Sequence, residues 1–388
     1  MSSKILVTGM GVCSAIGMSP AEMWQNLSES KSGIQEVGYL KTRKSVLLGE
    51  VRQTNETLAG ILGLSSQPWS RTFLLALYAA QQALEEGRVN FETERIGFIH
   101  GSTVGGMDLT ELMIRENDWE ARDPQVLAQH DCGAIPDMME KALGVKFAYK
   151  NTISTACSSA ANAIIQGAQL LEAGLLDKVI VGGADALSLF TLNGFGALMI
   201  VSQDYCIPFD ANRKGLNLGE GAAYLVLEKG DAPKQAFAQI AGYANRCDAF
   251  HQTATSENGE GPFLAMKAAL EMANLERVDY INTHGTGTPN NDATEFAAMQ
   301  RVFGLEIPPF SSTKCFTGHT LAACGAIEAI ISILILKHQT VIGNLGFESS
   351  EIENCEPLRE NKDLSVTHIL SNSNGFGGND SAIVFSKV

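Results

Sequence analysis

The segment NTISTACSSAANAIIQGAQLL, residues 151–171, decides the fold because it joins a β-branched run to an alanine-rich helical pattern through a Ser/Thr-rich junction. The segment PFSSTKCFTGHTLAACGAIEAIISIL, residues 309–334, repeats this order in the second half of the chain. An internal echo of this kind indicates a repeated structural unit. One copy places Cys157 at the junction and the other places His319 there. We therefore expect two similar halves.

Outward from these segments, short β-branched runs alternate with Ala- and Leu-rich stretches, which is typical of an α/β fold with buried strands. The first half contains KILVTGMG (4–11), SRTFLLALYAAQQALEEG (70–87), RIGFIHGS (95–102) and KVIVGGAD (178–185). The second half contains AQIAGYANR (238–246), DYINTHGTG (279–287) and THILSNSNGFGGNDSAIVFSK (367–387). Lys, Asp and Pro interrupt the pattern near residues 230–234, so we place a boundary between 1–232 and 233–388.

The composition of the chain excludes several classes of function. The chain has 388 residues, 45% of them hydrophobic, and its 28 Lys+Arg against 43 Asp+Glu give a net charge of −15. This apolar fraction is that of a folded globular protein and excludes general disorder. The acidic balance argues against a nucleic-acid or anionic-membrane surface, because both need a basic face. An acidic partner would therefore need a local basic patch.

Eight cysteines are scattered singly, with no Cys-x-x-Cys pair, so the sequence suggests neither a zinc ribbon nor a disulfide framework. We expect reduced thiols in a cytoplasm. The first residues, MSSKILVTGMGV, carry no signal-peptide pattern. The apolar runs at 189–201 and 326–336 are shorter than the roughly 18 residues that span a bilayer, so we expect a soluble protein.

Cys157 is the first candidate catalytic residue. It lies where a predicted strand ends and a small-residue helix begins. The helix macrodipole and its unpaired N–H groups stabilise a thiolate there, so we expect a lowered pKa and a nucleophile. The alternative is a buried and inert cysteine, which is the usual state of this residue.

His284 and His319 are the other candidates. His284 ends a predicted strand in THGTGTP, which lacks the spacing of a phosphate-binding loop, and His319 opens the second small-residue helix. With Cys157 they leave three interpretations open. The three side chains could bind zinc, they could include the Cys/His pair of a hydrolase, or the two imidazoles could stabilise an enolate while the thiolate holds an acyl group.

An ordered set of motifs covers essentially the whole chain. It comprises VTGMGVCSAIG (7–17), STACSSAANAI (154–164), HGTGTPNNDATE (284–295), SSTKCFTGHTLAACGAIEAI (311–330) and SNSNGFGGND (371–380). In this order the chain resembles the β-ketoacyl-acyl carrier protein synthases of the thiolase-like superfamily, both the elongating type II enzymes and stand-alone polyketide ketosynthases. The resemblance implies an α/β fold in which two pseudo-repeated βαβ halves form a layered αβαβα sandwich.

The resemblance also implies a reaction, the decarboxylative condensation of an acyl group on Cys157 with malonyl-acyl carrier protein. His284 and His319 would be the paired imidazoles, with Lys314 and Glu328 beside them. The remaining implied roles are pantetheine contacts for Thr286 and Thr288, a gate and oxyanion-hole N–H for Phe376, and an acyl tunnel for Val104, Phe195 and Asn374. No metal or redox cofactor is implied, because the phosphopantetheine arrives on the carrier protein.

Several positions depart from the family pattern. Asn374 stands where Phe is common, and Asn379-Asp380 where Thr-Asn is common, so the gating loop is more polar here and favours polyketide or polyene-type chains. The usual basic carrier-docking cluster is reduced to Arg71, and Ile207 replaces an arginine. We therefore expect docking on another basic set, Arg43 and Lys44 or Arg213 and Lys214.

The expected partners are an acyl carrier protein and a second subunit. The second subunit would be another copy of the chain or a chain-length-factor-like paralogue, paired through the strand around residues 148–153. Four alternatives stay open. They are an ordinary fatty-acid elongating synthase, a non-catalytic chain-length subunit, a thiolase-like acyltransferase that does not elongate, and a cysteine hydrolase. The retained Cys157 and histidines argue against the non-catalytic subunit, and the absence of a cysteine from residues 375–388 argues against a thiolase.

Overall fold

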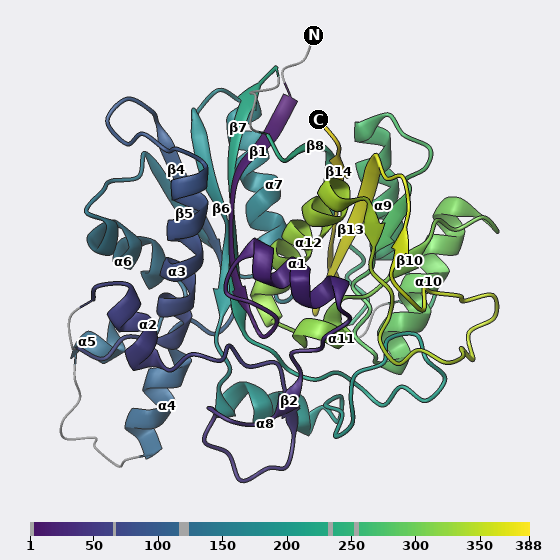
Figure 1. Ribbon diagram of the computed structural model, residues 1–388, viewed down its shortest axis with the longest axis horizontal. Coiled ribbons are helices and arrows are strands. Elements are labelled where there is room, and N and C mark those ends of the chain that lie inside the picture. The colour runs from purple at the N-terminus through teal and green to yellow at the C-terminus, as the bar shows by residue number, and fades with distance from the viewer. Residues whose placement is uncertain (1–3, 65–66, 116–123, 232–235, 252–255) are drawn as a thin grey trace.

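Ten strands form one mixed sheet in the computed structural model, which describes residues 4–64, 67–115, 124–231, 236–251 and 256–388 (Figure 1). Their order across the sheet is β10-β9-β13-β14-β8-β1-β7-β6-β4-β5. The bounds in chain order are β1 Lys4–Ser14, β4 Ile96–Gly101, β5 Tyr149–Ile153, β6 Lys178–Asp185, β7 Gly221–Gly230, β8 Ala238–Cys247, β9 Tyr280–Asn282, β10 Phe310–Ser311, β13 His368–Gly375 and β14 Asn379–Ser386. Two short hairpins lie outside it, β2 (Gln35–Glu36) with β3 (Leu47–Leu48) and β11 (Thr340–Val341) with β12 (Lys362–Asp363).

The two halves of this sheet have the same strand order. From the centre outward, β1-β7-β6-β4-β5 in one half matches β8-β14-β13-β9-β10 in the other. In the first half β7 is antiparallel to β1 and to β6, and in the second half β14 is antiparallel to β8 and to β13. The outermost pair of each half, β4 with β5 and β9 with β10, is parallel. The halves join where residues 5–7 of β1 pair with residues 238–240 of β8. The predicted boundary between residues 232 and 233 lies outside the described residues.

Helices cover both faces of the sheet and fill the space between its halves (Figure 1). Helices α7 (Ser159–Glu172) and α12 (Cys324–His338) each contact strands of both halves and each other. Helix α3 (Arg71–Glu86) covers the outer face of β1, β7 and β6, while α9 (Glu260–Ala273) and α10 (Pro289–Phe303) cover the other half. The layers therefore run α, β, α, β, α, as the sequence predicts.

The remaining helices are short and lie around these layers. They are α1 (Pro20–Ser28), α2 (Asn55–Ile61), α4 (Met107–Arg115), α5 (Pro124–Leu127), α6 (Ala134–Leu143), α8 (Leu189–Ala197) and α11 (Lys314–Thr317). Helix α1 begins at a Ser19 N-cap, whose hydroxyl accepts the N–H of Glu22, and Pro20 occupies its first turn.

The central helix α12 has apolar side chains around most of its circumference, because it is packed on all sides by the core of the protein. With the 3₁₀ turn Leu321–Ala323 before it, the helix reaches 18 residues and is apolar enough, by length and composition, to cross a membrane. The expectation that no apolar stretch reaches this length was therefore wrong, since it counted only residues 326–336. Of this stretch 89% is buried inside the protein, so in this fold it is a core helix.

The fold brings the junctions picked out in the sequence to one place. Cys157 follows β5 and precedes α7, and His284 follows β9. His319 lies between α11 and α12, and Phe376 lies in the turn that joins β13 to β14. The pseudo-repeat explains the meeting, because it directs the beginnings of α7 and α12 to the same centre between the half-sheets.

Candidate active site

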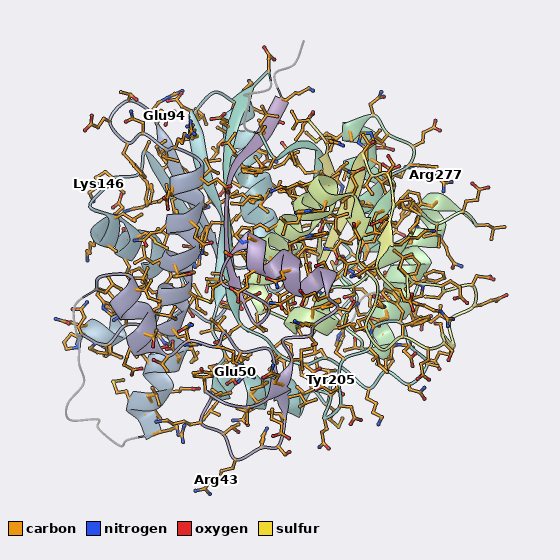
Figure 2. The ribbon with its side chains drawn as sticks, viewed as in Figure 1. Arg43, Glu50, Glu94, Lys146, Tyr205 and Arg277 are labelled. Atoms are coloured by element: carbon orange, nitrogen blue, oxygen red, sulfur yellow. The ribbon has the colours of Figure 1, made fainter. Side chains whose placement is uncertain are left out.

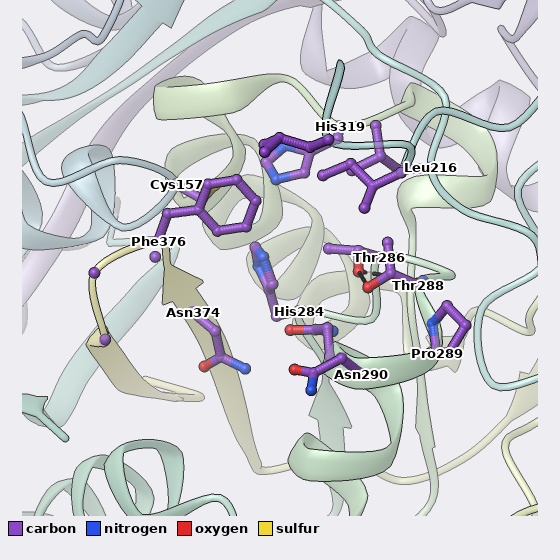
Figure 3. Close-up of a pocket in the computed structure, with 16 residues that line it drawn as sticks. Cys157, Leu216, His284, Thr286, Thr288, Pro289, Asn290, His319, Asn374 and Phe376 are labelled. Atoms are coloured by element: carbon purple, nitrogen blue, oxygen red, sulfur yellow. Dashed lines mark hydrogen bonds between the residues drawn. The ribbon is translucent and has the colours of Figure 1, made fainter. Parts of the chain in front are cut away.

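Cys157, His284 and His319 line one cavity of about 300 Å³ (Figure 3). The sulfur and one ring nitrogen of each histidine all lie within 4.8 Å of one another. The two imidazoles stand edge to face, with ring centroids 5.4 Å apart and planes at 84°. Each of the three residues is no more than 4% exposed. A thiol and two imidazoles therefore face one small volume that excludes bulk water.

The backbone around Cys157 is held in an unusual conformation. Ala156 has φ of +52°, a region that alanine rarely adopts and that costs free energy. The turn is fastened by Ser159, whose hydroxyl donates to the carbonyl of Ala156 at 2.6 Å and accepts the N–H of Thr155 at 2.9 Å. This strained turn directs the thiol toward the histidines instead of into the sheet.

Burial raises the pKa of Cys157 to about 11, while Lys314 and the backbone N–H of Phe376 act in the opposite direction. The position of Cys157 at a helix N-terminus predicts a lowered pKa, and that prediction was wrong. Loss of hydration outweighs the stabilising groups, because a buried thiolate has little water to solvate it. The resting enzyme therefore carries a protonated thiol.

His284 is neutral and its tautomer is fixed. Burial lowers the pKa of His284 well below its usual value, with Lys314 and His319 adding to the shift. The ammonium of Lys314 lies 3.2 Å from Nδ1 of His284 and donates to the His284 carbonyl at 2.6 Å. Because an ammonium can only donate, Nδ1 accepts and the ring proton is on Nε2.

His319 reaches the same state by a different contact. Its Nδ1 accepts the backbone N–H of Leu321 at 3.1 Å, which again leaves the proton on Nε2. Burial lowers the pKa of His319 well below its usual value, with Lys314 contributing. Two neutral imidazoles therefore each have an N–H free to donate to one acceptor.

Lys314 and Glu328 form a fully buried ion pair 2.5 Å long. Burial alone would lower the pKa of Lys314, but the carboxylate of Glu328 raises it above its usual value, so the lysine stays charged. Oε2 of Glu328 has no hydrogen-bond partner among the described residues. The resemblance places both residues beside the histidines, and the structure joins Lys314 directly to His284.

Phe376 lies in a tight turn that two glycines make possible. Gly377 and Gly378 have φ of +86° and +75°, which glycine adopts without strain. The Phe376 ring stacks on Phe195 with centroids 5.8 Å apart, and Phe195 meets His319 edge to face at 6.5 Å. The backbone N–H of Phe376 is directed at the sulfur of Cys157. This N–H is a donor placed where an oxyanion would form.

Asn379, one of the departures from the family pattern, anchors this turn to the nucleophile. Its side-chain oxygen accepts hydrogen bonds of 2.7 Å each from Ser158, Asn162 and Asn245. Ser158 directly follows Cys157, so the turn and the beginning of α7 are tied together.

Thr286 and Thr288 also line the cavity, with their hydroxyl oxygens 2.9 Å apart. Two carboxylates that the sequence analysis did not assign shape their loop. Asp292 accepts the N–H groups of Thr286 and Gly287 at 3.0 and 3.1 Å. Glu295 accepts those of His284 and Gly285 at 2.8 Å each. The signal was present in the HGTGTPNNDATE motif, where an Asp and a Glu follow within the first two turns of α10.

The three predicted tunnel residues do not form one surface. Asn374 lines the cavity, where Figure 3 shows it on the side of His284 and Asn290. Val104 does not line it and packs with Phe195 in an apolar cluster. That cluster meets the cavity through Leu216 and Ile200.

Two groups of side chains have the spacing of metal ligands, Cys157 with both histidines and His284 with Cys324 and Glu328. Both groups include His284, whose Nδ1 lies 3.2 Å from the ammonium of Lys314. That positive charge opposes a divalent cation at either group.

Arg213, one of the expected docking residues, and Arg71, the remnant of the usual docking cluster, are not at the surface. Arg71 is buried, forms a 2.7 Å ion pair with Glu220 and donates to the Val51 carbonyl. Arg213 is buried, pairs with Glu351 at 3.1 Å and donates to the Asp210 carbonyl. Both are structural residues, so this part of the docking expectation was wrong.

Two family models match the chain almost end to end. Residues 2–232 match the Beta-ketoacyl synthase, N-terminal domain, and residues 237–348 match the Beta-ketoacyl synthase, C-terminal domain. The chain belongs to the β-ketoacyl synthase family. Its enzyme class is that of the acyltransferases named 3-oxoacyl-[acyl-carrier-protein] synthase. The protein of this name with the suffix 2 from Staphylococcus aureus (strain COL) is 32% identical over 412 residues, covering 100% of this chain and 99% of that one.

Other relatives agree. The 3-oxoacyl-[acyl-carrier-protein] synthase 2 of Coxiella burnetii is 32% identical over 416 residues, covering 99% of each chain. Among solved structures, the ishigamide ketosynthase/chain length factor has a TM-score of 0.91 and 27% identity, with full coverage of both chains. The ketosynthase ApeO of Xenorhabdus doucetiae, solved with its chain length factor ApeC, has a TM-score of 0.88 and 30% identity, covering 100% of this chain and 98% of that one. The predicted ketosynthase fold is confirmed.

Proposed function

We propose that this β-ketoacyl synthase condenses an acyl group on Cys157 with malonyl-acyl carrier protein and releases carbon dioxide and β-ketoacyl-acyl carrier protein. The observation that carries the proposal is the convergence of two neutral imidazoles, each with its proton on Nε2, beside a buried thiol. Two neutral donors without a general base suit the stabilisation of an enolate oxygen better than the activation of water.

The first step loads the enzyme. The sulfur of Cys157 attacks the carbonyl of an acyl-pantetheine thioester, and the thiol proton passes to the departing pantetheine sulfur. The oxyanion formed on the way is stabilised by the backbone N–H groups of Cys157 and Phe376. The raised pKa of Cys157 fits this exchange, because the thiol needs to lose its proton only while the substrate is present.

The second step breaks the bond between C2 of the malonyl group and its carboxylate. Carbon dioxide leaves, and the electron pair becomes an enolate whose oxygen accepts from Nε2 of His284 and His319. C2 then attacks the acyl carbonyl on Cys157, a carbon–carbon bond forms, and the cysteine sulfur leaves as a thiolate that takes up one proton from the solvent. These steps use only the chain's own residues and the pantetheine thioester, so we propose no metal or redox cofactor.

For the substrate we propose a polyketide or polyene-type chain. Asn374, Asn290 and Asn291 line the cavity, and their amides favour a conjugated or oxygenated chain over a plain alkyl chain. The likeness to ketosynthases solved with chain length factors supports this, while the curated relatives support an ordinary fatty-acid elongating synthase as the alternative. Faster condensation of saturated chains, unchanged in Asn374→Phe, would favour the alternative.

We also propose that the enzyme works with a carrier protein and as a dimer, either of two copies or with a chain-length-factor-like paralogue. Strand β5 ends the sheet and pairs only with β4 among the described residues, so a subunit that covers its free edge would satisfy its N–H and C=O groups. Light scattering on the purified chain, alone and with any co-encoded paralogue, tests this. A fully active monomer would contradict both forms.

The function itself is tested by incubating the enzyme with an acyl-carrier and a malonyl-carrier and measuring the mass of the carrier. A condensing enzyme gives a carrier lengthened by one two-carbon keto unit, and Cys157→Ala gives none. A hydrolase would give free acid and an empty carrier. A thiolase-like acyltransferase would join acetyl units while the malonyl carboxylate stays intact.

A further inference from the structure

Residues 41–44, Lys-Thr-Arg-Lys, form the densest basic segment of this acidic chain. No other four-residue stretch of the sequence has three basic side chains, and the net charge of the whole chain is −15. Lys41, Arg43 and Lys44 are all exposed, and none has an ion-pair partner among the described residues. Figure 2 shows Arg43 at the tip of the loop, pointing away from the body of the protein. We call these four residues the basic loop.

The basic loop has a rigid base. It lies between strands β2 and β3, and the buried Glu50 accepts the N–H groups of Gly38, Tyr39 and Leu40 at 2.7, 2.9 and 2.7 Å. Three backbone bonds to one carboxylate fix the path of the chain just before Lys41. A fixed base presents the three charges in one place, which lowers the entropy cost of binding a partner.

The basic loop is connected to the catalytic cavity through an apolar cluster. Leu40 and Val46, which flank it, pack on the apolar cluster that contains Leu216, a lining residue of the cavity. On its other side, a Cβ on Gly196 would lie 3.3 Å from Nζ of Lys44. Gly196 is in the last turn of α8, so the ammonium also meets the negative end of a helix dipole.

The other basic residues considered in Sequence analysis carry no free charge. Arg71 and Arg213 are buried in the ion pairs described above. Lys214 is exposed, but it pairs with Asp204 at 2.8 Å. Position 207, where the family often has arginine, is isoleucine. Of the sets the sequence analysis offered, only the one containing Arg43 and Lys44 remains available.

From the density, exposure and position of these charges, we infer that the basic loop is the electrostatic docking site for the acidic acyl carrier protein. This inference rests on the proposed function, which requires a carrier to bring the pantetheine arm to Cys157. An acidic partner is repelled by the surface of a chain with charge −15 unless a local positive patch guides it. The basic loop supplies that patch.

The test compares two malonyl donors in the enzyme and in the charge-reversed variant K41E/R43E/K44E. With malonyl-carrier the variant's KM should rise about tenfold or more, since steering of this kind changes association by at least that factor. With malonyl-pantetheine, which has no carrier, KM and kcat should stay within about twofold. Raising the salt concentration should raise the KM for malonyl-carrier in the native enzyme and have little effect in the variant.

The matched control is R88E/K141E/K387E, which changes the net charge equally at three exposed positions away from the basic loop that have no ion-pair partner among the described residues. It should leave the KM for malonyl-carrier unchanged. An unchanged KM in the loop variant, or an equal rise in the control, would overturn the inference. If the native enzyme condensed neither donor, the proposed function would fail instead, so the two failures are distinguishable.

Discussion

The ammonium of Lys314 lies 3.2 Å from Nδ1 of His284 and 2.5 Å from the carboxylate of Glu328, so one buried lysine links the catalytic imidazole to the core. Lys314 does not reach the substrate cavity in this arrangement, since it is absent from the cavity lining. It acts as a positioning residue, because it fixes the tautomer of His284 and contributes to the lowering of its pKa.

Replacing Lys314 should therefore damage the decarboxylation step. Lys314→Met alone leaves the carboxylate of Glu328 buried without its partner, which costs about 3–5 kcal/mol of stability. The double variant Lys314→Met/Glu328→Gln should recover most of that stability but release carbon dioxide roughly 10–100-fold more slowly. Its pH profile should show a histidine titrating at higher pH, because the positive charge that lowers the pKa of His284 is gone. Unchanged rate and pH profile would refute the positioning role.

The two histidines should matter more for decarboxylation than for loading. His284→Ala and His319→Ala each remove one donor to the enolate oxygen, and each should lower the rate of carbon dioxide release about 10²-fold or more. Acylation of Cys157 should survive in part, because the backbone N–H groups of Cys157 and Phe376 stabilise that oxyanion. Rapid-quench acylation and labelled carbon dioxide release, measured on the same variants, separate the two steps. A variant that decarboxylates normally would contradict the assignment.

Cys157 should be labelled selectively only by reagents that resemble the substrate. Its pKa is raised to about 11, so a small alkylating agent at neutral pH should react first with the exposed Cys247. An acyl-carrier, or an electrophile with an acyl chain that fills the cavity, should modify Cys157 first. Between pH 7 and 10 the alkylation rate of Cys157 should keep rising, because the thiolate fraction grows throughout that range. Peptide mapping checks both statements, and a rate that levels off near pH 7 would contradict the raised pKa.

Asp380 should make the protein less stable as the pH rises. It is 1% exposed, neither carboxylate oxygen has a hydrogen-bond partner among the described residues, and burial, Asp248 and Glu295 raise its pKa to about 8. Between pH 4 and 8 the folded state binds this proton and the unfolded state does not, so the free energy of unfolding falls with rising pH by up to about 1.4 kcal/mol per unit.

The substitution Asp380→Asn tests this, because it keeps the shape and removes the titration. The free energy of unfolding of the variant, measured with denaturant, should rise relative to that of the native protein as the pH is raised from 5 to 8. Equal stability differences at every pH would mean that Asp380 does not titrate in this range.

Much of the catalytic site could be predicted from the sequence, because its residues lie in short sequence motifs. Cys157 and His319 stand at equivalent junctions of the repeated segments 151–171 and 309–334, and His284 stands at a predicted strand end. The two similar halves followed from the same repeat, and the layered fold from the family resemblance. Each of these features depends on residue type and local order, which the sequence contains directly.

What could not be predicted depends on contacts between distant residues. Arg71 and Glu220 are 149 positions apart, and their ion pair turns an expected surface cation into a core residue. The pKa of Cys157 depends on how deeply the thiol is buried, and a motif does not contain that depth. The anchoring of Thr286 by Asp292 was visible as a motif, but only the structure shows which N–H groups the carboxylate accepts.

The most direct test of the account is a single turnover of enzyme acylated on Cys157 with malonyl-carrier labelled with ¹³C in its free carboxylate. The account predicts one labelled carbon dioxide for each carrier lengthened by a two-carbon keto unit, together with the return of Cys157 to the free thiol. A lengthened carrier that retains the label, or free acid released from Cys157 with no lengthened carrier, would contradict it.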